Sequence, residues 1–462
     1  MNILYIGAGF VGACSAAVSA ANGHTVLVYD IDQKKIDMLN SRNPGTIEAC
    51  LFEQGLGALL VQYQSSIQFT TDYHKMEEFL NGCDGVFMCL PTPEIRETGQ
   101  SDLTFYESAL ETLSAALLAR NGGAQEKYVV LINKSTVPIG MARKVEQVLT
   151  SKGVKNYGIA SNPEFLVGGK AVEGSLKPDR VVVGANNQKD FEIVRGIYHR
   201  FFGSTHTQYI EVTTTEAEAG KLMANFCLFQ KVVMCFDVVG RTCEAFPDIR
   251  FEQMRQILTS DKRIGDWGFF DSIYAGGSCL IKDTRSLTHQ LQAVGTNTDL
   301  IEQVYLGNER QLESFLSRFE SETGQSWVGK KVALFGLAFK KDTNDVRNSA
   351  SLKIASFLKE KAVAKLYLHD PVAISEFKKF FPEDKILSYV VEEAEAVREA
   401  EVVIIATDWP QYQTVADLFS ADASSRLIIM DGRRMLVRAY DELQNKGYTI
   451  IAVGSPVMKG KI

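Results

Sequence analysis

The chain has 462 residues, of which 45% are hydrophobic and 23% are charged, as in globular proteins with more than one hydrophobic core. Its net charge of −7 argues against a nucleic-acid partner or an anionic membrane surface, so an anionic ligand would need a local basic pocket. The eight cysteines are scattered without metal-ligand spacing, which predicts no metal site and reduced thiols in a cytoplasm. We also expect no apolar stretch long enough to span a membrane.

The N-terminus carries a glycine-rich turn between a strand and a helix. An apolar run at residues 3–6 leads into Gly7, Gly9 and Gly12, and Asp30 ends the next apolar run at roughly the 20-residue spacing of a dinucleotide-binding unit. The glycines let a pyrophosphate approach the helix start, and the acid accepts the ribose hydroxyls. The sequence therefore predicts NAD rather than NADP. The alternative is a glycine turn without a cofactor.

Polar residues follow the next predicted strands. Residues 84–90 and 129–134 read as buried strands that end in Pro91-Thr92-Pro93 and in a Ser-Thr-Val-Pro turn. Ligands of parallel sheets bind beyond such strand ends, although ordinary turns use the same residue types. Glu164 follows another short strand in an apolar setting and could act in proton transfer. Its alternative is a surface glutamate in a turn.

A long helix is predicted after the strand signals stop near residue 212. Apolar residues recur at helical spacing from Glu216 to Val239, and Gly240 is expected to end the run. Lys221 and Asn225 lie four residues apart on one face of this helix. A solvated pair on an exposed helix is the alternative. A helix of this length between two α/β portions is typical of a domain bridge or a subunit interface.

A Gly-Gly-Ser-Cys segment marks the end of this helical portion. Gly276 and the following glycine allow close backbone approach, and Lys282 and Asp283 come three and four residues after Cys279. If a helix begins at Cys279, these two residues return to its face in the first turn, and the peptide N–H groups there favour thiolate over thiol. The pattern makes Cys279 a candidate nucleophile. The alternative is a small buried hydrophobic residue.

A second α/β portion is predicted from about residue 329. Residues 331–336, 365–371 and 401–406 read as strands, but this portion has no glycine fingerprint. Several basic residues lie near strand ends or turns and could together bind an anionic ligand, or could simply be solvated. They are Lys340, Arg347, Arg433 and Arg434.

These elements predict an α/β fold with two Rossmann-like doubly wound domains, joined by a helical middle domain with a long connecting helix. The expected boundaries are 1–210 for the NAD-binding domain, 211–325 for the helical central domain, and 326–462 for the second Rossmann-like domain.

Ten segments of the chain together resemble the nucleotide-sugar 6-dehydrogenases of the UDP-glucose/GDP-mannose dehydrogenase family. The resemblance covers essentially the whole chain, and ten matches in the family's order are very improbable by chance. In chain order they are Gly7-x-Gly9-x-x-Gly12, Asp30, Pro91-Thr92-Pro93, Ser135-Thr136-Val137-Pro138, Asn162-Pro163-Glu164-Phe165-Leu166, Lys221-x-x-x-Asn225, Asp261-x-Arg263-Ile264-Gly265, Gly276-Gly277-Ser278-Cys279-x-x-Lys282-Asp283, Gly336-x-Ala338-Phe339-Lys340 and Asp431-Gly432-Arg433.

The resemblance implies a four-electron oxidation of UDP-glucose to UDP-glucuronate with two molecules of NAD. In this chemistry Cys279 adds to the intermediate aldehyde, and the resulting thiohemiacetal is oxidised to a thioester that water hydrolyses. GDP-mannose or another nucleotide sugar stays open as the substrate. Two other kinds of protein are alternatives. A two-electron hydroxyacid dehydrogenase needs no such cysteine segment. A catalytically silent nucleotide-sugar sensor would lack Cys279, Lys221 or Asp283.

The resemblance also implies a role for each matching residue. The catalytic set is Cys279, Lys221, Asn225, Asp283, Glu164 and Thr136. The cofactor set is Gly7, Gly9, Gly12, Asp30, Lys35, Thr136, Lys282 and Arg347. The substrate set is Phe165, Leu166, Lys221, Asn225, Arg263, Gly276, Lys340 and Arg433. Arg263 matches a position that reaches the site of a neighbouring subunit, which implies a homodimer or a higher homo-oligomer.

The chain departs from the family pattern at three places. Gly168 replaces a second glutamate, which puts more weight on Glu164 and Asp283. Tyr274-Ala275 replaces a glycine–aromatic pair before the double glycine, and Ile281 replaces a proline or glutamine. None of these departures removes a residue that the covalent mechanism needs.

Overall fold

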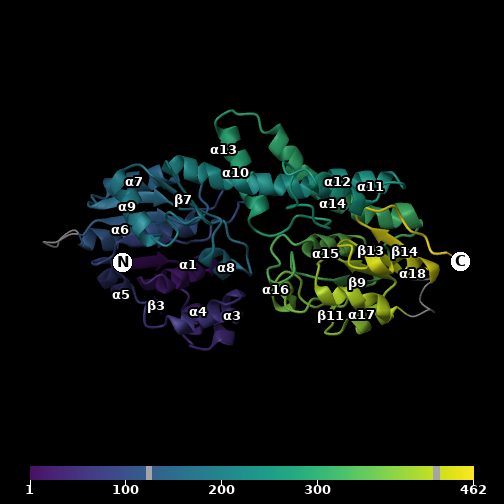
Figure 1. Ribbon diagram of the computed structural model, residues 1–462. Coiled ribbons are helices and arrows are strands. Elements are labelled where there is room, and N and C mark those ends of the chain that lie inside the picture. The colour runs from purple at the N-terminus through teal and green to yellow at the C-terminus, as the bar shows by residue number, and fades with distance from the viewer. Residues whose placement is uncertain (121–126, 420–426, 462) are drawn as a thin grey trace. The chain divides into compact units, whose positions relative to one another are not determined.

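The computed structural model describes residues 1–120, 127–419 and 427–461, which form two compact units (Figure 1). The first unit contains residues 1–224 and 286–296, and the second contains residues 225–285 and the residues from 297 onward. The division falls inside helix α10 (Thr214–Val233) and inside helix α13 (Leu280–Ala293). The three-domain boundaries stay predictions.

The first unit is built on an eight-stranded sheet in the order β3-β2-β1-β4-β5-β6-β7-β8. Its first six strands have the order of a doubly wound dinucleotide-binding sheet and are parallel, whereas β7 pairs antiparallel to β6. The strands are β1 (Asn2–Ile6), β2 (Thr25–Tyr29), β3 (Ile67–Thr70), β4 (Gly85–Met88), β5 (Val129–Asn133), β6 (Tyr157–Ser161), β7 (Arg180–Ala185) and β8 (Gln208–Val212).

Helices cover both faces of this sheet, so its central strands are apolar throughout rather than alternating. One face packs against α1, α3, α4, α8 and α9, and the other against α5, α6 and α7. The helices are α1 (Phe10–Ala21), α2 (Gln33–Leu39), α3 (Pro44–Leu51), α4 (Leu56–Gln62), α5 (Tyr73–Leu80), α6 (Thr104–Arg120), α7 (Met141–Ser151), α8 (Ala171–Leu176) and α9 (Gln188–Ile197).

The second unit contains a six-stranded parallel sheet in the order β11-β10-β9-β12-β13-β14, which repeats the doubly wound order. Its elements are β9 (Lys331–Phe335), α15 (Ala350–Glu360), β10 (Lys365–His369), α16 (Ile374–Lys378), β11 (Leu387–Tyr389), α17 (Glu393–Glu399), β12 (Val402–Ile405), η2 (Pro410–Leu418), β13 (Ile428–Asp431), η4 (Val437–Ala439), α18 (Tyr440–Asn445) and β14 (Thr449–Ala452). The predicted α/β class with two Rossmann-like sheets is confirmed.

The part of the chain between β8 and β9 is helical, as predicted. In addition to α10 and α13, it contains the π-helical segment η1 (Met234–Gly240), α11 (Arg241–Ala245), α12 (Phe251–Thr259) and α14 (Asp299–Thr323). Apolar residues of α14 and α15 pack together against one face of the second sheet. Helix α13 begins directly after Cys279, at the position that the sequence indicated.

The prediction that the long helical run ends at Gly240 is wrong. Gly240 has φ −59° and ψ −48°, which are helical values, and the run continues to Ala245. A glycine ends a helix when it adopts the left-handed conformation, and Gly240 does not. The π-helical turns of η1 precede it, and the run ends at Phe246, whose φ of −118° and ψ of 101° are extended.

The expectation that no apolar stretch is long enough to span a membrane is also corrected. The helical run 214–245 has 32 residues and a mean hydropathy of 1.6 in its most apolar window, so by length and composition alone it could span a membrane. Core helices of soluble proteins pass the same test, and 44% of this window is buried inside the fold. Within the run, Glu218 accepts hydrogen bonds from the Gly140 and Ala142 amides at 2.6 and 2.8 Å, as a core helix can.

Candidate active site

The glycine turn after β1 leaves an opening at the start of helix α1. A Cβ on Gly7 would lie 2.3 Å from the Cys89 carbonyl oxygen, and one on Gly12 would lie 2.0 Å from the Gly7 carbonyl oxygen, so packing requires both glycines. A Cβ on Gly9 would meet nothing within 4 Å. No side chain caps the first amides of α1. The open space at this helix N-terminus fits a pyrophosphate.

Asp30 lies at the end of β2 and holds the glycine turn. Its carboxylate accepts a hydrogen bond from the Ala8 amide at 2.6 Å and forms an ion pair with Lys35 at 3.0 Å. Its exposed fraction is low but not zero, so hydroxyl groups of a ribose can still reach it, whereas a ribose phosphate would be repelled. The predicted cofactor residues of this turn therefore lie together and fit NAD.

The second sheet has a counterpart of Asp30 that is used entirely within the fold. Asp370 follows β10, and one of its oxygens accepts hydrogen bonds from the Leu337 and Ala338 amides at 2.7 and 3.1 Å. The Trp409 indole N–H donates to the same oxygen at 3.1 Å, and Asp370 is buried. Because these bonds and its burial occupy Asp370, its carboxylate is not accessible to the ribose of a ligand, although the second sheet has the same architecture as the first.

Four predicted site residues lie together in the first unit. The Lys221 ammonium is 3.2 Å from a carboxylate oxygen of Glu164, and their side chains are only 5% and 9% exposed. The other oxygen of Glu164 accepts a hydrogen bond from the Leu166 amide. The Lys221 ammonium also lies 5.2 Å from the centre of the Phe165 ring. Glu164 is thus a buried ion-pair partner rather than a surface turn residue.

Thr136 follows β5 in a turn whose other polar residues brace the backbone. The Thr92 hydroxyl donates to the Thr136 carbonyl oxygen at 2.7 Å. The Ser135 hydroxyl accepts from the Leu90 amide at 2.7 Å. Thr92 and Ser135 therefore stabilise the turns, which is the alternative to a role in ligand binding. They fix two neighbouring strand ends against each other beside Thr136.

Lys134 was not predicted as a site residue, although it lies beside this cluster. Its ammonium donates to the Asn162 side-chain oxygen at 2.9 Å, and the Tyr198 hydroxyl donates to the same oxygen at 2.6 Å. Burial lowers the pKa of Lys134 to about 8, partly offset by Cys89 and Glu164. Lys134 and Glu164 line one cavity of about 490 Å³. The sequence signal that could have identified Lys134 as a site residue is its position as a single lysine directly after an apolar strand.

Cys279 occupies the position that caps helix α13 in the second unit. It is exposed, and its carbonyl oxygen accepts the Asp283 amide at 2.9 Å, which confirms the predicted helix start. The preceding glycines are tightly packed, because a Cβ on Gly276 would lie 2.6 Å from the Asn348 carbonyl oxygen. Of the other cysteines, Cys227 alone is also exposed. The thiol therefore lies at the helix N-terminus, where a thiolate is favoured.

Asp283 gathers two further predicted residues. Its side chain is 1% exposed and accepts a hydrogen bond from the Asn225 amide at 2.5 Å. Its other oxygen forms an ion pair with Lys282. Asn225 of α10 and the first turn of α13 are thereby held together within the second unit, and the alternative of a solvated residue does not hold for Asn225.

Three predicted arginines form ion pairs with carboxylates in the second unit, as does a fourth, Arg434. Arg347 pairs with Asp345 at 2.7 Å, and this contact raises the pKa of Arg347. Arg433 pairs with Asp408 at 2.8 Å. Arg263 pairs with Asp261 at 2.6 Å but is 90% exposed, so its guanidinium is presented to the surroundings. The Lys340 ammonium lies 5.8 Å from the centre of the ring of Phe339, the residue before it.

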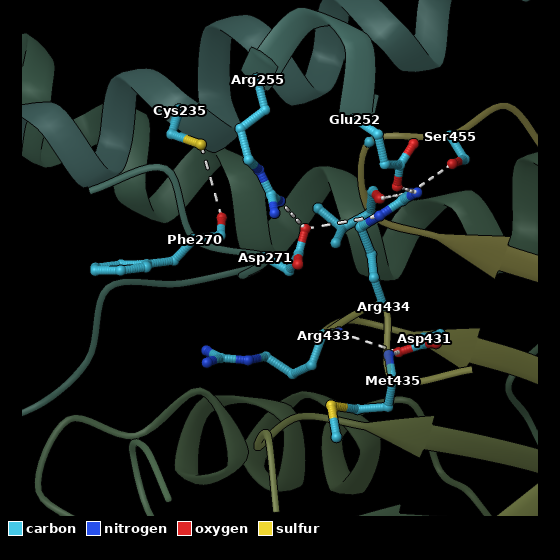
Figure 2. Close-up of polar contacts among 12 residues, drawn as sticks. Cys235, Glu252, Arg255, Phe270, Asp271, Asp431, Arg433, Arg434, Met435 and Ser455 are labelled. Carbon is cyan, nitrogen blue, oxygen red and sulfur yellow. Dashed lines mark hydrogen bonds and ion pairs between the residues drawn. The ribbon is translucent and has the colours of Figure 1, made fainter. Parts of the chain in front are cut away.

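The suggestion that Arg434 belongs to a pocket for anionic ligands is corrected by its contacts. Arg434 is buried, donates to the Val453 carbonyl oxygen at 3.0 Å and to the Ser455 hydroxyl at 2.6 Å, and pairs with Glu252. Figure 2 shows the two neighbouring arginine side chains pointing in different directions, with only Arg434 in this network. Its contacts with α12 and the segment after β14 give it a structural role.

The predicted residues thus fall into both units. The first unit contains Gly7, Gly9, Gly12, Asp30, Lys35, Thr136, Glu164, Phe165, Leu166 and Lys221. The second contains Asn225, Arg263, Gly276, Cys279, Lys282, Asp283, Lys340, Arg347 and Arg433. Among the residues that the structure describes, no three His, Cys, Asp or Glu side chains are grouped to hold a metal ion.

Three family models match the chain, and all three describe the UDP-glucose/GDP-mannose dehydrogenase family. The NAD binding domain matches residues 1–202, the central domain residues 215–310, and the UDP binding domain residues 333–438. Together they match well over half of the chain in one consistent order.

Curated relatives and a solved structure match nearly the full length. UDP-glucose 6-dehydrogenase TuaD of Bacillus subtilis is 30% identical, over 99% of this chain and 94% of its own. UDP-glucose 6-dehydrogenase of Pseudomonas aeruginosa is 30% identical, over 99% and 98%. A UDP-glucose dehydrogenase structure from Pyrobaculum islandicum is 28% identical, with a TM-score of 0.83 over 94% of each chain. A UDP-D-ManNAc dehydrogenase from Pyrococcus horikoshii, 21% identical with a TM-score of 0.77, shares the fold.

Proposed function

Because the chain belongs to the UDP-glucose/GDP-mannose dehydrogenase family and uses NAD, we propose that it oxidises the C6 alcohol of UDP-glucose to the carboxylate of UDP-glucuronate. The observation that carries the proposal is the exposed Cys279 thiol at the N-terminus of α13, behind a double glycine. A two-electron alcohol dehydrogenase needs no nucleophile there.

Cys279 provides the covalent step between the two oxidations. When bound, NAD accepts a hydride from the sugar carbon, once per molecule of cofactor. The first oxidation turns the alcohol into an aldehyde, and the Cys279 thiolate then forms a carbon–sulfur bond to it. The second oxidation turns this thiohemiacetal into a thioester. Water breaks the carbon–sulfur bond, releases the carboxylate and returns the thiol, so the aldehyde is never free.

Glu164 and Lys221 are proposed to serve the oxygen atom at the reacting carbon. Lys221 would stabilise negative charge that develops on this oxygen, and Glu164 would move protons, directly or through a water that Thr136 helps to hold. Their 3.2 Å ion pair supports this assignment, because it holds the carboxylate and the ammonium side by side in a buried place. Gly168 offers no second carboxylate in this loop.

Asp283 and Asn225 are proposed to orient the sugar end and the hydrolytic water. Asp283 is buried and already receives the Asn225 amide, so its carboxylate has a fixed direction. Lys282 is proposed as the cofactor contact beside it, together with Arg347. The position of Asp283 one helical turn after Cys279 supports an action on the same reacting carbon.

The nucleotide half of the substrate is proposed to bind the second sheet, where Lys340 and Arg433 provide positive charge. Phe165, Leu166 and Gly276 would contact the sugar or its diphosphate through side chain and backbone. Two further residues also belong to the proposed substrate set, Lys221 and Asn225. Arg263 is proposed to complete the site of a second copy, which its 90% exposure supports and which makes the enzyme a homodimer or larger.

The chain is also proposed to act in the cytoplasm and to divide into domains at residues 1–210, 211–325 and 326–462. Two alternatives concern the substrate rather than the chemistry: GDP-mannose, or another nucleotide sugar such as a UDP-N-acetylhexosamine. A two-electron hydroxyacid dehydrogenase is the alternative from another class.

The stoichiometry of the reaction separates these alternatives. The purified protein is incubated with NAD and UDP-glucose, and NADH is counted against uronic acid formed. Two NADH per sugar support the proposal, whereas one NADH with a free aldehyde contradicts the covalent mechanism. Parallel reactions with GDP-mannose and UDP-N-acetylmannosamine test the substrate, because turnover with one of these and none with UDP-glucose would overturn the assignment while keeping the chemistry.

A further inference from the structure

The segment that leads to Cys279 is anchored by Tyr274, one of the residues that depart from the family pattern. Tyr274 is 4% exposed, and its hydroxyl donates to a carboxylate oxygen of Glu309 on helix α14 at 2.8 Å. The other oxygen of Glu309 accepts from the Lys353 ammonium of helix α15 at 2.7 Å. This ammonium lies 5.2 Å from the centre of the Tyr274 ring. Tyr274, Glu309 and Lys353 therefore form a closed set from three separate elements.

The next residue, Ala275, is held at both of its backbone groups. The Ala275 amide donates to the Asn308 side-chain oxygen at 2.8 Å, and the Asn308 side-chain amide donates to the Ala275 carbonyl at 3.2 Å. Asn308 is completely buried, so water does not compete for these bonds. Two consecutive residues of α14 thus bind two consecutive residues of the cysteine segment.

The glycines that follow pack closely against Phe339. A Cβ on Gly276 would lie 3.0 Å from the Phe339 side chain, and one on Gly277 would lie 3.0 Å from the Phe339 ring. Gly277 also has a φ of +88°, a backbone conformation that residues other than glycine rarely adopt. A displacement at Tyr274 would therefore be carried along the backbone to Cys279, five residues later, where helix α13 begins.

The Glu309–Lys353 pair is partly exposed, with side chains 24% and 38% accessible, so its attraction alone adds little stability. Its position is what matters: it fixes the acceptor of the Tyr274 hydroxyl. We propose that Tyr274 is a positioning residue that sets the place of the Cys279 thiol through residues 275–278, with Glu309 as its anchor. This rests on the proposed role of Cys279 as the nucleophile.

The test compares Tyr274→Phe with Tyr128→Phe. Tyr128 is a matched control, because its hydroxyl also lies 2.8 Å from a carboxylate oxygen, that of Asp190 in the first unit. Each protein is treated with iodoacetamide over a range of pH, and mass spectrometry follows the alkylation of Cys279. Cys227, the other exposed cysteine, is the internal reference. Turnover with NAD and UDP-glucose is measured alongside.

For Tyr274→Phe we expect kcat to fall about tenfold with KM changed less than about twofold, since a displacement near 1 Å can cost up to about a hundredfold in rate. The Cys279 alkylation rate should change at least about threefold, equivalent to about 0.7 kcal/mol. Alkylation of Cys227 should not change, and Tyr128→Phe should behave as the wild type in every one of these measurements.

Two changes at Glu309 keep the test decisive if Tyr274→Phe folds poorly. Glu309→Gln keeps an oxygen for the Tyr274 hydroxyl and should retain most of kcat, whereas Glu309→Ala should match Tyr274→Phe. Equal Cys279 alkylation in Tyr274→Phe and Tyr128→Phe, or in Glu309→Gln and Glu309→Ala, would overturn the inference. Alkylation needs no substrate, so absence of UDP-glucuronate would defeat the proposed function alone.

Discussion

The Lys221 ammonium lies 3.2 Å from the Glu164 carboxylate, and the two side chains are 5% and 9% exposed. This pair joins helix α10 to the loop after β6, where the Leu166 amide donates to the other oxygen of Glu164. A buried charge without its partner is costly, so each of the two residues offsets the cost of burying the other. Their proposed roles as proton carrier and oxyanion stabiliser are therefore linked.

This link predicts a strong coupling in stability. Lys221→Met or Glu164→Gln alone should lower the free energy of unfolding by about 3–5 kcal/mol, because each leaves the other residue buried without its partner. The double variant should lose clearly less than the sum of the two. Urea denaturation of all four proteins measures the coupling. Additive losses would contradict a buried ion pair.

Lys134 predicts a dependence of stability on pH. Burial lowers the pKa of Lys134 to about 8 in the folded chain, against about 10.4 in the unfolded chain. Between these values Lys134 binds more protons in the unfolded chain, so the Lys134 contribution to the free energy of unfolding should rise with pH, by up to about 3 kcal/mol. Lys134→Met should remove this rise, and Lys127→Met, a change at an exposed lysine, should keep it. An unchanged rise in Lys134→Met would contradict this pKa.

Local patterns in the sequence were sufficient for most of the fold. The strands at β1, β2, β5 and β9 are short apolar runs bounded by glycines or by polar turns, and each lies where it was predicted. The Gly-Gly-Ser-Cys segment correctly placed the start of α13 after Cys279. These features depend on residues close in the chain, so a single sequence contains them.

Features that depend on distant residues were missed. Gly240 looked like a helix end, but packing of the run beyond it keeps the helical conformation through Ala245. Arg434 looked like part of a ligand pocket until its contacts with Glu252 and Ser455 were seen. Tyr274 had no explanation from the sequence, because its partner Glu309 is 35 positions away on α14.

The glycine turn predicts that two substitutions by alanine have different effects. Gly9 has φ −69° and open space around a Cβ, so Gly9→Ala should fold with an unchanged melting temperature. The added methyl group would occupy the space that fits the pyrophosphate, and the Kd of NAD should rise about tenfold or more, equivalent to about 1.4 kcal/mol. Gly12→Ala should also lower the melting temperature, because its Cβ would lie 2.0 Å from a carbonyl oxygen. Calorimetric titration of NAD and thermal unfolding distinguish them, and tight NAD binding by Gly9→Ala would contradict the placement.

Cys279→Ser tests the covalent step. The serine hydroxyl is a far weaker nucleophile than a thiolate, so release of uronic acid should fall by at least about a hundredfold while NAD binding is unchanged. Cys227→Ser is the matched control, since Cys227 is the other exposed cysteine and has no proposed role. Single-turnover reactions analysed by mass spectrometry should show a sugar adduct on the wild-type segment and none in Cys279→Ser. Uronic acid at the wild-type rate would disprove the covalent mechanism.

Asp30 predicts the choice between the two coenzymes. Its negative charge lies where the adenosine ribose is expected, and its oxygens also accept the Ala8 amide and pair with Lys35. Asp30→Asn removes the charge but keeps an oxygen for the Ala8 amide, so the turn should persist while repulsion of a ribose phosphate is lost. The ratio of kcat/KM for NADP to that for NAD should then rise about tenfold or more, equivalent to about 1.4 kcal/mol. Asp32→Asn, which keeps the cap of helix α2, should leave this ratio unchanged because Asp32 binds the Lys35 amide. A ratio that is equal in Asp30→Asn and the wild type would show that the carboxylate does not face the ribose.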